Sequence, residues 1–160
     1  MSGKADFSAD EWDLLRSSPL MASMLVVAAS PSGPVGLVQE STATAKTIMQ
    51  SVGTAQTPLL KALSEDVTRT MAIPKPPPGA TPGQVQEAAA EILRRTSALL
   101  TTKATPEEMD EIKVWLAKVA QATAEAAKEG GFLGFGVASV SDQEKAALAM
   151  LNTALGLGTP

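Results

Sequence analysis

The chain has no cysteine and no histidine among its 160 residues. Without cysteine it can form no disulfide, no thiolate-bound zinc or iron–sulfur site, and no cysteine nucleophile. Without histidine it lacks the commonest general base, the usual transition-metal ligand and the side chain that titrates near neutral pH. The SxxK and GxSxG patterns of serine nucleophiles are also missing. We therefore predict a protein that is not an enzyme, with no catalytic residue and no cofactor.

Aromatic side chains are scarce as well: they make up 3% of the residues, and none is tyrosine. Apolar residues nevertheless reach 44% and charged residues only 19%, a balance typical of globular proteins. The core must then be built from alanine, leucine, valine, isoleucine and methionine. The length suits one domain with a substantial core.

Basic runs are also absent, and the net charge is −4. This charge predicts no nucleic-acid partner and disfavours an anionic membrane surface. The longest uncharged stretch, 17–39, contains three prolines, and its apolar part, 20–29, has about half of the ~20 residues that a spanning helix needs. We expect a buried helix and a turn there, and no membrane span. No secretory signal is recognisable at residues 1–6, so the expected location is the cytoplasm.

What the sequence does contain is clear helix starts. Capping boxes pair a Ser or Thr with a Glu or Gln three residues later, so that each side chain bonds the other's backbone amide. Four such pairs occur, Ser8–Glu11, Thr81–Gln84, Thr105–Glu108 and Ser141–Glu144. Phe7, just before the first cap, can pack on Trp12. These signals predict an all-α protein.

Apolar residues recur with helical spacing between these starts. Two examples are Met109, Ile112, Leu116 and Val119, and the stripe Val38, Ser41, Ala45, Ile48 and Val52, which we expect to face the core. We predict a compact, mostly up-and-down bundle of about seven helices, over 9–17, 19–29, 34–52, 58–72, 82–101, 106–129 and 142–155.

A proline-rich linker, 74–80, divides this predicted domain, 1–160, into halves 1–73 and 81–160. Consecutive prolines favour a stiff, extended spacer. We interpret the linker as a crossover between helix pairs. A domain boundary and a docking site for a reader of proline-rich peptides are the alternatives.

Two of the three phenylalanines lie in a glycine-rich segment, 130–136. The segment matches neither GxGxxG nor GxxxxGK[ST], and the acidic residues of the helix start that follows would repel a phosphate. Gly130 and Gly131 can instead end the preceding helix. The apolar side chains of Phe132, Leu133 and Phe135 then either fill the core or anchor a partner or second subunit, which makes them our candidate interaction residues.

The stretch 28–33, followed by Glu40, resembles the TerB-like (tellurite-resistance-associated) family, in which a helix ends in an acidic, glycine-containing turn and a Glu follows in the next helix. The start at 141–144 is likewise similar to the last helix of small bacterial helical proteins. The TerB-like resemblance implies an all-α fold. Because Ser30 and Ser32 stand at the acidic positions, only Glu40 is carried over, as a candidate metal ligand.

Two hypotheses for the function follow. The leading one is a non-enzymatic, cytoplasmic interaction or scaffold protein that associates with itself or with a protein partner. The alternative is a TerB-like, stress-associated protein that binds a small ligand or a divalent metal through carboxylates.

Overall fold

The prediction of an all-α protein is confirmed by a computed structural model, which describes residues 2–30, 34–71, 76–129 and 141–158. A short 3-10 helix, η1 (Lys4–Asp6), precedes six α-helices. The α-helices are α1 (Ala9–Val27), α2 (Pro34–Thr54), α3 (Pro58–Thr70), α4 (Pro82–Lys103), α5 (Pro106–Glu129) and α6 (Asp142–Leu155). No strand occurs in these ranges, and no helix in them is both long and apolar enough to cross a membrane.

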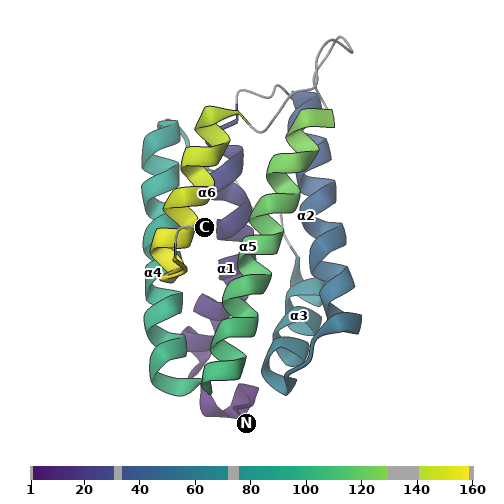
Figure 1. Cartoon of the computed structure of the whole chain (residues 1–160), viewed down its shortest axis with the longest axis vertical. Coiled ribbons are helices and arrows are strands. Elements are labelled where there is room, and N and C mark those ends of the chain that lie inside the picture. Colours follow the sequence, from purple (N-terminus) through teal and green to yellow (C-terminus); the bar gives the residue numbers. More distant parts are fainter. Residues whose placement is uncertain (1, 31–33, 72–75, 130–140, 159–160) are drawn as a thin grey trace.

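The four longest helices run along the long axis of the molecule (Figure 1). Helix α1 packs against α4 and α5, α2 packs against α5 and α3, and α6 packs against α4. The core is mainly aliphatic, and both halves of the chain contribute to it. Its fully buried leucines include Leu15, Leu25, Leu63, Leu93, Leu116 and Leu151.

The four capping boxes form as predicted. At α1, the Ser8 amide donates to Glu11 Oε2 at 2.7 Å, and the Glu11 amide donates to Ser8 Oγ at 3.2 Å. The starts of α4, α5 and α6 show the same reciprocal pairs. The Phe7 and Trp12 rings pack with centroids 6.0 Å apart, as expected of a hydrophobic staple. These starts were predictable because all their partners lie within a few residues.

One predicted boundary is wrong: the segments 9–17 and 19–29 form a single helix, α1, with Pro19 inside it. Proline has no amide hydrogen to donate to the carbonyl four residues earlier, which here belongs to Leu15. The Ser18 hydroxyl donates to that carbonyl instead, at 2.6 Å. Both Ser18 and Leu15 are fully buried, so this bond satisfies a carbonyl that proline would otherwise leave without a donor in the core.

The proline-rich linker connects α3 to α4, and its described part contains a tight turn. The Ala80 amide donates to the Pro77 carbonyl at 3.1 Å, and Gly79 has a φ of 79°. A proline at the second turn position and a glycine with positive φ at the third are typical of a type II turn. The sequence Pro77-Pro78-Gly79-Ala80 therefore reverses the chain before α4 begins.

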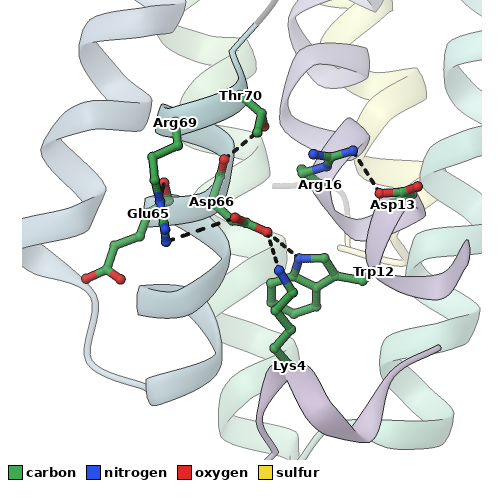
Figure 2. Close-up of polar contacts among 8 residues, drawn as sticks. All are labelled: Lys4, Trp12, Asp13, Arg16, Glu65, Asp66, Arg69 and Thr70. Atoms are coloured by element: carbon green, nitrogen blue, oxygen red, sulfur yellow. Dashed lines mark hydrogen bonds and ion pairs between the residues drawn. The ribbon is translucent and has the colours of Figure 1, made fainter. Parts of the chain in front are cut away.

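A polar cluster fastens the amino-terminal segment to α1 and α3 (Figure 2). Asp66 Oδ2, on α3, accepts from the Trp12 indole at 2.7 Å and from Lys4 Nζ at 2.9 Å. The Arg69 guanidinium approaches the other carboxylate oxygen at 4.0 Å. The Lys4 hydrogen bond and, after it, the Trp12 hydrogen bond lower the pKa of Asp66, because both stabilise the ionised carboxylate.

Candidate functional site

Of the candidate residues that the sequence singles out, the structure describes only Glu40. Phe132, Leu133 and Phe135, with the expected helix end at Gly130–Gly131, lie outside the described residues. Glu40, the candidate metal ligand, is fully buried on the inner face of α2. Within the parts of the chain that the structure describes, no three Asp or Glu side chains lie close enough together to hold a metal ion.

Over residues 38–54, where the structure describes the burial of its side chains, helix α2 has a mostly polar inner face. The buried positions in this range are Glu40, Thr44, Ile48 and Ser51, and only Ile48 among them is apolar. Of the stripe predicted to face the core, Ile48 is buried and the prediction is wrong at Val38, which is exposed. Ser41, Ala45 and Val52 are half-buried. The helix is rotated about its axis relative to that prediction, and in this orientation Thr44 meets hydroxyl partners on α1 and α5.

The same rotation turns apolar side chains toward solvent. Val38 is 65% exposed and Met49 57% exposed, and they are two of the three large hydrophobic residues that are exposed in the described structure. Thr42, also exposed, and the half-buried Ala45 lie between them with helical spacing. We call Val38, Thr42, Ala45 and Met49 the outer stripe. Single exposed apolar residues are common on protein surfaces and need no explanation. A helix that exposes apolar side chains while it buries polar ones is unusual, and such a surface is a candidate binding site.

A groove of about 530 Å³ adjoins the outer stripe, between α1 and α2. Its walls are mainly aliphatic and its other lining side chains carry hydroxyls; the described lining residues are Leu20, Ser23, Met24, Val27, Val38, Ser41, Thr42, Thr44, Ala45 and Met71. Three members of the outer stripe, Val38, Thr42 and Ala45, line this groove. The groove and the stripe are thus one continuous surface, and none of its described lining residues is charged.

Below this groove, three buried hydroxyls join α1, α2 and α5. Thr44 Oγ1 lies 2.7 Å from Ser23 Oγ and 2.9 Å from Thr123 Oγ1, and Thr123 Oγ1 lies 3.2 Å from Ser23 Oγ. Thr44 and Thr123 also contact the carbonyls of Glu40 and Val119, at 2.8 and 2.9 Å. Each of the three hydroxyls has one hydrogen, so three of these five contacts can be hydrogen bonds at any one time. The triangle explains how Thr44, a polar side chain of α2, is accommodated in the core.

A second, more polar pocket of about 450 Å³ lies on the other side of α2, against α5. Glu111 borders it and binds the loop between α2 and α3, accepting from the amides of Gln56 at 2.5 Å and Thr57 at 3.0 Å. The Trp115 indole nitrogen, which is buried, has no hydrogen-bond acceptor among the described residues. Lys118 at the rim forms no ion pair within the described part of the chain.

The carboxylates with shifted pKa values are used to hold the fold. The Lys103 hydrogen bond, followed by the Ser8 amide, lowers the pKa of Glu11. Burial tends to raise the pKa of Glu108, but the hydrogen bonds from the Thr105 and Ser2 amides outweigh it, and the net shift is downward. These groups are held ionised by their partners, and each of them fastens a helix start or the amino-terminal segment.

Comparisons with known proteins add no relative from which a role could be transferred: no protein-family model, no curated protein and no solved structure matches the chain. The candidate site therefore depends on the geometry of α2 and its surroundings.

Proposed function

We propose that this protein is a non-enzymatic, cytoplasmic interaction or scaffold protein that binds a protein partner or a second copy of itself through the outer face of α2. The observation that carries the proposal is the inverted distribution on this helix: Glu40, Thr44 and Ser51 are buried, whereas Val38 and Met49 are exposed. Covering those two side chains with a partner would remove apolar surface from water and stabilise a complex.

The surroundings of the stripe support a binding role. The groove beside it is concave and largely aliphatic, and a convex apolar side chain of a partner would fit there. The surface close to the stripe carries one exposed charged residue of α2, Lys46. Burial of the stripe would therefore desolvate few charges, which keeps the electrostatic penalty of association small.

The test is a glutamate placed in the stripe. We expect Met49→Glu to abolish association, because a partner would have to bury an unpaired carboxylate. Val114→Glu is the matched control, since Val114 is the third exposed large hydrophobic residue of the described structure and lies on α5. Sedimentation velocity over a range of concentrations measures self-association, and quantitative affinity purification measures the retention of other proteins. If Met49→Glu and Val114→Glu both behave like the unaltered protein, the proposal is wrong.

The second proposal is a TerB-like, stress-associated protein that binds a small ligand or a divalent metal through carboxylates. It would use Glu40, which is buried on α2. We rank it second because the groove that could admit a ligand has hydroxyls and aliphatic groups, and no carboxylate, among its described lining residues.

A further inference from the structure

We propose that the outer stripe binds the outer stripe of a second copy of this chain, with the two α2 helices antiparallel about a two-fold axis. In this register Val38 lies opposite Met49 of the second copy, and Thr42 lies opposite Ala45. The inference rests on the proposed function and makes it more specific, because it names the partner, the orientation and the register.

The order of side chains along α2 suits such a pairing. From Val38 to Met49 the stripe presents a large, a small, a small and a large side chain, at spacings of four, three and four residues. Both the sizes and the spacings are the same when the helix is read in the opposite direction. A two-fold interface requires this property, since each residue must meet the residue that meets it in return. Thr42 and Ala45 at the centre allow the two backbones to approach closely.

Electrostatics favour the antiparallel orientation over the parallel one. Lys46, the exposed cation of α2, lies opposite Ser41 of the second copy when the helices are antiparallel. The two lysines are then offset by five residues, about 7.5 Å along the axis. A parallel, in-register pair would place the two Lys46 side chains at the same level and align the two helix dipoles, and both effects are repulsive.

The groove between α1 and α2 gives each Met49 a site to enter. Val38 is both a member of the stripe and part of the groove wall. A Met49 side chain that lies opposite Val38 is therefore at the mouth of the second copy's groove. The thioether side chain is long and flexible, and such side chains fill irregular apolar space well. The two-fold axis repeats the contact, so that each copy fills the groove of the other.

The size of the contact predicts a weak dimer. Stable interfaces bury about 800 Å² on each partner. The outer stripe contributes two large exposed apolar side chains from each copy, Val38 and Met49. We expect a monomer–dimer equilibrium in the micromolar range by sedimentation, not a permanent dimer.

Disulfide trapping tests the register directly, because the native chain has no cysteine to interfere. Val38→Cys and Met49→Cys proteins, differently tagged, are mixed under mild oxidation. We expect a disulfide between the two variants, and far less of it within either variant alone, because position 38 meets position 49 and not itself. In the control mixtures, Thr102→Cys takes the place of one of the two variants and measures the disulfides formed by random collision. Thr102 is exposed on α4. Circular dichroism verifies that each variant is folded.

Each other outcome overturns the inference. Disulfides within Val38→Cys alone would indicate parallel helices. Yields equal to those with Thr102→Cys would show that the second copy does not cover the stripe. In that case the proposed function still stands if Met49→Glu releases another protein that the unaltered chain retains. If Met49→Glu changes no association at all, the proposed function fails together with the inference.

Discussion

Helices α2 and α5 lie side by side in the bundle but differ in what they bury (Figure 1). The inner face of α5 is apolar over most of its length, with buried residues that include Ile112, Trp115, Leu116, Val119 and Ala120. Over the described side chains of α2, residues 38–54, the inner face has a single buried apolar side chain, Ile48, among Glu40, Thr44 and Ser51. The hydrophobic effect thus accounts for the position of α5 but for only part of the position of α2.

The difference indicates that two kinds of interaction hold the two helices. Side chains of α5 stabilise the fold by leaving water, and this hydrophobic contribution does not depend on direction. On α2, Thr44 contributes through hydrogen bonds to Ser23 and Thr123, which hold only at one rotation of the helix about its axis. That rotation turns Val38 and Met49 outward. The specific orientation of α2 in the bundle and its exposed apolar stripe therefore have one cause.

Truncating one apolar side chain on each helix gives the largest expected contrast. Leu116→Ala, on α5, removes a fully buried side chain and should lower the free energy of unfolding by about 2–5 kcal/mol. Met49→Ala, on α2, removes an exposed one and should change it by about 0.5 kcal/mol or less. Urea denaturation at low protein concentration, where the chain is monomeric, measures both. Equal losses would show that Met49 belongs to the core and would end the distinction between the two helices.

The next effect concerns α3, the helix that packs on α2 and is fastened by Asp66 (Figure 2). Asp66→Ala leaves the buried indole of Trp12 without its acceptor and should lower the free energy of unfolding by about 1–3 kcal/mol. The control is Asp13→Ala, because Asp13 forms an exposed ion pair with Arg16 and such pairs contribute about 0–1 kcal/mol. Urea denaturation at pH 7 compares the two variants.

The Asp66 variant also has a pH dependence of predictable sign. The folded-state pKa of Asp66 is lowered, so the unfolded chain takes up the proton first as the pH falls. The stabilisation by Asp66 is complete well above the unfolded pKa of about 3.9 and is lost as the pH falls through the lower, folded-state value. The gap in stability between Asp66→Ala and the unaltered protein should therefore be constant from neutral pH to about 5 and shrink below about 4. A gap that widens in acid would contradict this assignment.

The hydroxyl triangle gives a smaller effect with a distinctive pattern. Thr44→Val removes the hydroxyl that contacts both Ser23 and Thr123, and should lower the free energy of unfolding by about 1 kcal/mol. Replacing all three, with Ser23→Ala and Thr123→Val added, should cost less than the sum of the three single changes, because no hydroxyl then remains with a missing partner. Strict additivity in denaturation experiments would mean that the three groups act independently and do not orient α2 together.

The parts of the fold that could be predicted from the sequence are those with local causes. A capping box needs residues only three apart, so Ser8, Thr81, Thr105 and Ser141 identified four helix starts. The continuous helix through Pro19 was missed because proline usually ends a helix, and its compensation here is one hydroxyl, that of Ser18, directed at one buried carbonyl.

The candidate site was missed for a different reason. On α2 the predicted stripe and the buried face have Ile48 in common. When a helix has polar residues on both sides, its sequence pattern indicates only weakly which face is buried. Thr44 is buried because Ser23 and Thr123, at 21 and 79 residues' distance, meet it in space. No local pattern contains that information. A usable signal was the spacing of Val38 and Met49 along a stretch whose charged residues are only Glu40 and Lys46.

The smallest expected effect is that of a divalent metal ion on stability. It extends the comparison of α2 with α5 to one buried carboxylate on each helix, Glu40 on α2 and Glu108 on α5. Glu108 has a structural role, since it accepts from the amides of Ser2 and Thr105. Among the described residues no three acidic side chains are placed so that they could hold a metal ion. A ligand that binds the native state would raise the melting temperature, so we expect millimolar Ca²⁺ or Mg²⁺ to leave it unchanged. A saturable rise that is lost in Glu40→Gln and kept in Glu108→Gln would instead place a metal at α2. The TerB-like proposal would then replace the interaction surface as the better account of why α2 buries a carboxylate.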